Sequence, residues 1–394
     1  MADKLEVLVL NQVSPAGLQR LPAGRYALLT ESRDPDAVLV RSQDLHRMQF
    51  GARLKAVARA GAGTNNIPVP ALSARGIPVF NAPGANANAV KELVIAGMLM
   101  AARNLGPALD FVRALDRAAP DFERRVEDGK KAFAGAELPG QTLGVIGLGK
   151  IGSLVADAAI RLGMQVVGYD PDITVEGAWS LPSQVRRASS VDELLRASRF
   201  VTLHVPLAER TRHLIGAHNL GQLGAGAILL NFSRQGIVDD AAVLAALAAG
   251  KLHAYVTDFP TPALIGVPGV VALPHLGAST GEAEDNSAVM AVEQLREYLE
   301  HGNLRNAVNF PEAVMGRESP YRLAIANANV PDMLARISHA MGERGINIHN
   351  MLNKSRGEVA YTLVDVDSPV PQGALAALRA IDGVLVVRYL PLEP

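Results

Sequence analysis

The sequence contains no cysteine. Without thiols the chain has no disulfides, no thiolate catalysis and no zinc sites built on sulfur, and its histidines and acids show no metal-ligand spacing, so we expect no metal. A net charge of −1 provides no long-range field to attract nucleic acid or an anionic membrane. The longest apolar run, residues 93–102, is too short to span a bilayer, and the N-terminal run is too short for a signal peptide. We therefore expect a cytoplasmic protein that binds neither nucleic acid nor membrane.

Length and composition indicate a globular protein of two or three domains. The chain has 394 residues, of which 49% are hydrophobic and 20% are charged. Short apolar runs alternate with helical stretches, which is typical of βαβ units and parallel sheets. A long helix is expected at residues 87–104, and the charged residues 117–140 are expected to be a linker or an exposed loop. The first expected strands are residues 5–10, 26–29, 37–40, 55–60 and 77–82.

A second alternating pattern begins at Thr142 and predicts a doubly wound sheet. Its expected strands are residues 142–147, 165–170, 199–206, 227–233, 253–258 and 270–275, with helices such as 150–162 and 240–249 between them. Residues 321–390 then follow the order β-α-β-β-α-β, which is that of a ferredoxin-like module. The predicted fold class is therefore α/β, with two Rossmann-like doubly wound parallel-sheet domains and a C-terminal ferredoxin-like domain.

The stretch Gly147-Leu148-Gly149-Lys150-Ile151-Gly152 fits the G-x-G-x-x-G pattern of dinucleotide-binding turns. It follows a buried-strand run, begins a helix and precedes a strand that ends in Asp170. Such glycines let a pyrophosphate approach the backbone, the helix N-terminus receives its charge, and the acid binds the adenosine ribose. A carboxylate repels a 2′-phosphate, and no arginine follows at Pro171-Asp172, so the predicted cofactor is NAD rather than NADP. An ordinary tight βα turn is the alternative.

A P-loop is a second alternative for the same turn, because residues 144–150 also read G-x-x-x-x-G-K. Ile151 stands where a P-loop has the serine or threonine whose hydroxyl holds magnesium. We therefore reject a kinase or NTPase.

Polar residues follow the expected strands at the edge where open α/β sheets bind ligands. Arg234 is suited to a two-pronged pair with the carboxylate of a 2-hydroxy or 2-oxo acid. His275 is suited to take a hydroxyl proton as hydride leaves, because imidazole titrates near neutrality. The alternatives are that Arg234 is a solvated loop residue and His275 a helix-cap histidine.

These motifs resemble the D-isomer-specific 2-hydroxyacid dehydrogenase family over essentially the whole chain. The resemblance rests on residues 147–152 with 169–170, 204–206, 231–236 with 238–239, 274–279, and the loops 58–66 and 81–86. It implies a discontinuous substrate-binding domain, an inserted NAD-binding domain and a C-terminal ACT domain. Their expected ranges are 1–103 with 284–312, 104–283, and 318–394.

The branch of the family that the chain resembles most oxidises 3-phospho-D-glycerate to 3-phosphohydroxypyruvate with NAD, in the first step of L-serine biosynthesis. The substrate implied is a phosphorylated 2-hydroxy acid. Two alternatives stay open. One is a glyoxylate or hydroxypyruvate reductase of the same family, and the other is a non-catalytic NAD-sensing scaffold.

The resemblance also implies roles for matching residues. Arg234 would bind the substrate carboxylate and His275 would be the acid/base. The family's glutamate partner for this histidine is missing, so Asp258 either replaces it or only bonds the nicotinamide carboxamide. The expected cofactor-binding residues are Gly147, Gly149, Lys150, Ile151, Gly152, Asp170, His204, Val205, Pro206, Ser233, Arg234, Asp258, His275 and Gly277. The expected substrate-binding residues are Arg41, Arg59, Ala60, Gly61, Arg75, Lys91, Arg234 and His275.

For the C-terminal module, the resemblance implies an amino-acid site across a dimer. The matching residues are Asn327, Asn329 and Asn347, whose amides both donate to a carboxylate and accept from an ammonium group. Asp332 stands where many relatives have glycine. L-serine is therefore an expected effector, and a homo-oligomer, a dimer or tetramer, is expected. The alternative is that the C-terminal module has a purely structural role in the oligomer.

Overall fold

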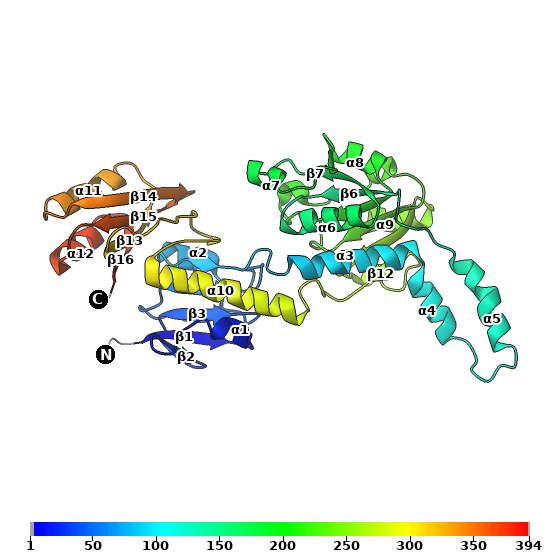
Figure 1. The fold of residues 1–394 in the computed structure, drawn as a ribbon, viewed down its shortest axis with the longest axis horizontal. Helices are drawn as coiled ribbons and strands as arrows, with labels where there is room; N and C mark the ends of the chain where they lie inside the picture. The colour runs from blue at the N-terminus through cyan, green and yellow to red at the C-terminus, as the bar shows by residue number, and fades with distance from the viewer. Residues whose placement is uncertain (1–3, 393–394) are drawn as a thin grey trace. The chain divides into compact units, whose positions relative to one another are not determined.

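The computed structural model describes residues 4–392. The chain forms two compact units (Figure 1). Unit 1 comprises residues 1–86 and 281–394, and unit 2 comprises residues 87–280. The chain therefore passes between the units at Asn86–Ala87 and again at Thr280–Gly281.

Unit 1 contains a parallel sheet of five strands in the order β2-β1-β3-β4-β5. The strands are β1 (Leu5–Leu10), β2 (Tyr26–Leu29), β3 (Ala37–Val40), β4 (Ala56–Arg59) and β5 (Val79–Phe80). Helices α1 (Pro15–Leu18) and α10 (Gly281–His301) cover one face, where Ala288, Val292 and Leu295 of α10 join the core. Leu72 of α2 (Val69–Ala74) packs into the core of the other face. A helix late in the chain thus completes the core of the first sheet.

The C-terminal part of unit 1 has the predicted ferredoxin-like order. Its elements are β13 (Tyr321–Ala328), α11 (Met333–Gly342), β14 (Ile348–Arg356), β15 (Val359–Val366), α12 (Gln372–Arg379) and β16 (Val384–Pro391). The strands form an antiparallel sheet in the order β14-β15-β13-β16. Leu323 and Ile325 of β13 join the core under α11 and α12, whereas Ala324 and Ala326 join the core around α10. Both faces of this sheet are therefore covered, because successive side chains point to opposite faces.

Two arginines attach this module to the C-terminal end of α10. Arg322 is 0% exposed, pairs with Asp365 (Nε to Oδ1, 2.6 Å), and donates to the carbonyl oxygens of His301, Met315 and Gly316. Arg388 donates to the carbonyl oxygens of Tyr298 and Leu299. The last carbonyls of a helix lack intrahelical partners, so these guanidinium groups complete the end of α10.

Unit 2 contains a parallel sheet of seven strands in the order β12-β11-β10-β9-β6-β7-β8. The strands are β6 (Thr142–Ile146), β7 (Gln165–Tyr169), β8 (Arg186–Arg187), β9 (Phe200–Leu203), β10 (Ala227–Asn231), β11 (Leu252–Thr257) and β12 (Val270–Ala272). The helices are α3 (Ala87–Ala102), α4 (Leu105–Arg113), α5 (Phe122–Gly129), α6 (Lys150–Arg161), α7 (Val175–Trp179), α8 (Val191–Ala197) and α9 (Asp240–Ala248), with short 3-10 turns at Lys130–Phe133, Glu209–Thr211, Leu220–Gln222 and Pro262–Leu264. Separate cores lie on its two faces, α3 and α6 contributing to one and α8 and α9 to the other. The predicted doubly wound sheet is confirmed.

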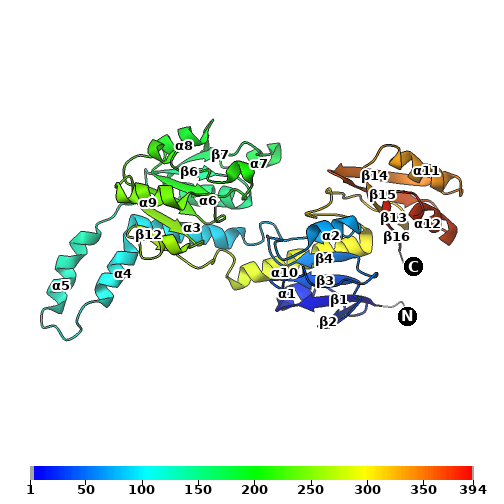
Figure 2. The ribbon, with the colours of Figure 1, turned by 180° about the vertical axis from the view of Figure 1, so that it is seen from behind.

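Three expectations differ from the structure. Helix α3 belongs to unit 2 instead of the first domain, because Val94 and Met98 pack into its core and Gly97 lets the helix approach Phe232. The expected linker at residues 117–140 contains α5, and Figure 2 shows α4 and α5 as paired helices extending away from the sheet. Strand β8 was not expected, because two adjacent arginines carry no strand pattern.

Candidate active site

The glycine-rich turn connects β6 to α6, and its glycines allow other groups to approach its backbone closely. Gly147 has a φ of 89°, and a Cβ there would lie 2.6 Å from the carbonyl oxygen of His204. Gly149 is the N-cap of α6, and a Cβ at this position would meet nothing within 4 Å. The space beside the N-terminus of α6 is therefore open, which suits an anionic group.

Asp170, at the end of β7, orders the turn. Its Oδ2 accepts a hydrogen bond from the N–H of Leu148 (2.8 Å), and its Oδ1 accepts one from the N–H of Asp172 (3.0 Å). Beside it lies a cavity of about 410 Å³. The cavity is lined by Ile146, Gly147, Gly149, Tyr169, Asp170, Pro171, Asp172, His204, Val205, Pro206, Arg210, Thr211 and Leu214. These residues fit a dinucleotide, because a carboxylate, a helix N-terminus and apolar walls meet in one cavity.

His204 lines the same cavity as a neutral imidazole. Burial lowers its pKa to about 3, and its Nε2 lies 3.0 Å from the Thr202 hydroxyl. His204 is therefore not positively charged at neutral pH and does not act there as an imidazolium acid.

Arg210 is a cavity residue that the sequence reasoning missed. No arginine was expected near the acid that follows β7, yet Arg210 lines the cavity and pairs with Asp172. The hydrogen bond from Arg210 holds the pKa of Asp172 below its ordinary value. The Asp172 carboxylate thus offsets the arginine charge. No sequence signal points to this pair, because folding alone brings the two segments together.

Buried hydrogen bonds fix the loop after β10, which carries Ser233 and Arg234. Asn231 is 1% exposed; it accepts from the N–H of Ser233 (3.1 Å) and donates to the carbonyl oxygen of Arg234 (3.0 Å). The Ser233 hydroxyl donates to the carbonyl oxygen of Val205 (2.6 Å), which ties this loop to the one after β9. The guanidinium of Arg234 is exposed and donates to the carbonyl oxygen of Ser233 (2.7 Å).

Asp258 and His275 follow the neighbouring strands β11 and β12. Asp258 is 1% exposed, and its Oδ2 accepts from the N–H of Gly277 (3.2 Å), whereas its Oδ1 has no partner within residues 4–392. Burial raises the pKa of Asp258, with His275 and the Gly277 N–H acting in the opposite direction. The His275 ring packs against Phe259 at 4.7 Å between centroids. In the described part of the chain no hydrogen bond joins Asp258 to His275, so their coupling is electrostatic.

In unit 1, Arg41 follows β3 and Arg59 is the last residue of β4, so both lie at the carboxyl edge of the sheet. Arg59 is half-buried and donates through Nε to the carbonyl oxygen of Arg41 (2.9 Å) and through Nη1 to that of Gly63. The loop of Ala60 and Gly61 therefore wraps this guanidinium. Arg41 pairs with Glu284 of α10 at 2.5 Å, a partner that the sequence reasoning missed.

Two other predicted cations lie apart from this pair. Arg75 donates to the carbonyl oxygens of Phe50 (3.1 Å) and Gly51 (2.5 Å), which precede β4 and so lie at the opposite edge of the sheet from Arg59. Lys91 belongs to α3 in unit 2, where it donates to Asn88 (2.5 Å).

The predicted effector residues lie at two ends of the C-terminal sheet. Asn327 pairs in register with Ala360 at one end, and the Asn329 amide donates to the carbonyl oxygen of Gly357 nearby. Asn347 immediately precedes Ile348, which pairs with Val366 at the other end, and its amide donates to Asp367. Six residues of strand separate the two ends, about 20 Å.

Within residues 4–392, no group of three or more histidine and acidic side chains is placed to hold a metal ion. No helix in this range has the length and apolarity needed to cross a bilayer.

The doubly wound sheet, its glycine-rich turn and the polar residues at its carboxyl edge define a nicotinamide-dinucleotide oxidoreductase domain. Residues 95–277 match the family model of the D-isomer specific 2-hydroxyacid dehydrogenase NAD binding domain. The D-3-phosphoglycerate dehydrogenase of Haemophilus influenzae is 31% identical over 416 residues, which cover 98% of both chains. That of Methanocaldococcus jannaschii is 37% identical over 353 residues, and the match spans 86% of this chain but only 63% of the relative.

Solved structures share the fold. The TT0316 protein of Thermus thermophilus matches with a TM-score of 0.62 and 26% identity over 79% of this chain and 100% of its own. The NAD+-bound 3-phosphoglycerate dehydrogenase of Entamoeba histolytica matches with a TM-score of 0.61 and 24% identity over 78% of this chain and 99% of its own. The chain belongs to the D-isomer specific 2-hydroxyacid dehydrogenase family, and it is an NAD-dependent oxidoreductase.

Proposed function

We propose that the chain oxidises 3-phospho-D-glycerate to 3-phosphohydroxypyruvate with NAD, the first step of L-serine biosynthesis. The observation that carries this proposal is the placement of Arg234 and His275 after β10 and β12, at the edge of the sheet that also holds the glycine-rich turn. Relatives similar over the whole chain are named for this activity.

The two residues have complementary roles in this proposal. Arg234 forms a bidentate ion pair with the substrate carboxylate. Its exposed guanidinium gives up its hydrogen bond to the carbonyl oxygen of Ser233 when the substrate binds. His275 takes the proton of the 2-hydroxyl group as the C2–H bond breaks. NAD, when bound, supplies the hydride acceptor. The buried Asp258 carboxylate stabilises the imidazolium through its field, which makes it the stand-in for the missing glutamate.

Arg59 is the proposed ligand of the substrate phosphate, with the N–H groups of the loop at Gly61 adding donors. Arg59→Met should lower kcat/KM for 3-phospho-D-glycerate by about 10- to 100-fold, because a hydrogen bond to a charged group contributes roughly 1.5–3 kcal/mol. Activity with an unphosphorylated 2-hydroxy acid should change much less. Arg75→Met is the matched control, because Arg75 lies at the other edge of the sheet. Equal losses on both substrates would contradict the phosphate role.

The direct test is NADH formation by the purified protein with NAD and 3-phospho-D-glycerate, compared with reduction of glyoxylate and hydroxypyruvate. A higher kcat/KM for the two unphosphorylated acids would favour the reductase. No turnover of any of them, with NAD binding intact, would favour the NAD-sensing scaffold.

We also propose that L-serine binds the C-terminal module. Because Asn327 and Asn347 lie at opposite ends of the sheet, a site that uses both needs a second copy of the chain. A homo-oligomer, either a dimer or a tetramer, is therefore part of the same proposal. We separately propose a cytoplasmic location. Unchanged rate and oligomer size at millimolar L-serine would leave the module a structural role only.

A further inference from the structure

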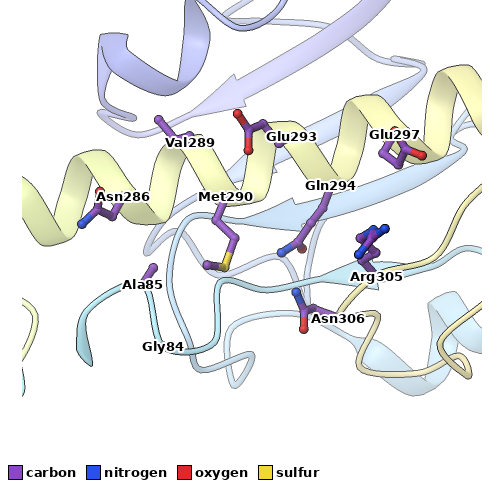
Figure 3. A pocket seen from close by; sticks show the side chains of 10 residues that line it. All are labelled: Gly84, Ala85, Asn286, Val289, Met290, Glu293, Gln294, Glu297, Arg305 and Asn306. Carbon is purple, nitrogen blue, oxygen red and sulfur yellow. The ribbon is translucent and has the colours of Figure 1, made fainter. Parts of the chain in front are cut away.

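A cavity of about 690 Å³ in unit 1 is not used by the proposed reaction. Helix α10 forms one wall, and the opposite wall consists of the loops at residues 84–85 and 305–306 (Figure 3). The cavity is lined by Gly84, Ala85, Asn286, Val289, Met290, Glu293, Gln294, Glu297, Arg305 and Asn306. None of these residues belongs to the glycine-rich turn or to the strand ends that carry Arg234 and His275.

Gln294 is a buried polar residue without a protein partner. It is 6% exposed, and neither Nε2 nor Oε1 makes a hydrogen bond within the described residues. Its neighbours on α10, Ala291 and Leu295, are apolar core residues. Figure 3 shows the Gln294 side chain extending from α10 toward the segment that carries Asn306. A buried amide without a partner costs roughly 1–3 kcal/mol, so a ligand that bonds it would recover that loss.

Charges of both signs face the same cavity. Arg305 is exposed and forms no hydrogen bond or ion pair with the part of the chain that the structure describes. The Glu297 Oε1 accepts from the Asn303 amide at 2.6 Å, which leaves Oε2 to bind another donor. Glu293 already pairs with Arg20 at 3.4 Å.

This charge pattern selects the chemistry of the ligand. Two carboxylates oppose a phosphate or a dicarboxylate, whereas a zwitterion presents a carboxylate to Arg305 and an ammonium group to Glu297. The Gln294 amide both donates and accepts, which suits either end of such a molecule. Met290 and Val289 add an apolar surface for a side chain.

We propose that this cavity binds a free α-amino acid. Its carboxylate pairs with Arg305, its ammonium group pairs with Glu297, and the Gln294 amide forms hydrogen bonds to either of these groups. The site lies beside both chain passages between the units: Ala85 shortly precedes the first, and Asn286 shortly follows the second. Residues of both segments that lead to unit 2 therefore line the cavity in which the ligand lies. Its binding is separate from the dehydrogenase activity and is measurable without it.

The test uses the full chain and each of the common L-amino acids at about 10 mM, with the thermal midpoint as a first readout and titration calorimetry for those that raise it. At least one amino acid should stabilise the wild type. Gln294→Leu and Arg305→Met should each weaken that binding at least about 10-fold, the loss of one charge-assisted or buried hydrogen bond. Arg33→Met, an exposed arginine of unit 1 outside this cavity, should leave binding unchanged.

Three results would overturn the proposal. One is that no amino acid shifts the midpoint of the wild type. The second is binding that survives both cavity variants but is lost in Asn347→Ala, which would assign the ligand to the C-terminal module. The third is equal affinity for the matching 2-hydroxy acid, which lacks the ammonium group. Arg305→Met changes an exposed residue, so the test holds even where Gln294→Leu folds poorly.

Discussion

At the scale of single residues, buried polar side chains hold the loops that carry Arg234 and His275, the residues proposed for catalysis. Asn231 bonds the backbone of Ser233 and Arg234 in the loop after β10, and Asp258 bonds the N–H of Gly277, two residues after His275. Neither Asn231 nor Asp258 is accessible to a substrate, since each is 1% exposed. Asn231 can act only by positioning, whereas Asp258 can act by positioning and through its charge.

Measurements over a pH series separate the effect of Asp258 on stability from its proposed effect on catalysis. Because its pKa is raised, the folded protein binds this proton more tightly than the unfolded chain, and stability falls as pH rises through the raised pKa. Asp258→Asn should therefore match the wild-type thermal midpoint below about pH 4 and exceed it by a few degrees at neutral pH.

The same variant should move the acidic limb of the pH–rate profile to lower pH, because removal of a carboxylate disfavours the protonated imidazole of His275. Thermal melts and kcat/KM are measured over the same pH series. An unmoved profile together with a raised midpoint would remove Asp258 as the histidine's partner while keeping the stability argument.

The buried pair of Arg322 and Asp365 gives a second prediction. Burial alone would raise the pKa of Asp365, but the hydrogen bonds from Arg322 and the Glu318 N–H outweigh it and lower that pKa. Arg322→Met should reduce the free energy of unfolding by roughly 3–5 kcal/mol, because it leaves a carboxylate unpaired. The double variant with Asp365→Leu should recover part of this loss in denaturant melts. A double variant as unstable as the single one would assign the loss to the carbonyl oxygens that Arg322 also binds.

At the scale of elements, two substitutions in the turn between β6 and α6 test NAD binding and folding separately. Gly149→Ala adds a methyl group where nothing lies within 4 Å, so the fold should be unchanged while NAD binds at least about 10-fold more weakly. Gly152→Ala places a Cβ against the carbonyl oxygen of Gly147 and should lower stability as well. Calorimetric titration of NAD and thermal melts distinguish the two. Normal NAD affinity in Gly149→Ala would show that the pyrophosphate lies elsewhere.

At the scale of the whole molecule, the chain forms two compact units joined by two passages. Cooperative unfolding of each unit predicts two transitions in scanning calorimetry. NAD should raise only the transition of unit 2, which holds the glycine-rich turn, because a ligand stabilises the unit that binds it. Gly149→Ala is the control that removes the shift. A single transition that rises as a whole with NAD would contradict independent unfolding of the units.

The sequence was sufficient for features set by local pattern. Short apolar runs that alternate with helical stretches predicted the two parallel sheets, and the β-α-β-β-α-β order predicted the third, since these patterns are short-range properties of the sequence. The glycine-rich turn was equally readable, because its function depends on backbone freedom at fixed spacing. The charged segment that contains α5 was wrongly expected to be a linker or loop, because its apolar residues are too few to show a helical period.

What the sequence determined by itself, then, was the fold class, the NAD turn and the residues that follow each strand. Only the tertiary structure decided which of these residues meet. It placed Arg75 at the edge opposite Arg59, paired Arg41 with Glu284, and put Asn347 at the far end of the sheet from Asn327. It also buried Gln294 beside a cavity. The physical reason is that such contacts join segments far apart in the chain, where packing and register set the partners and spacing along the sequence carries no information about them.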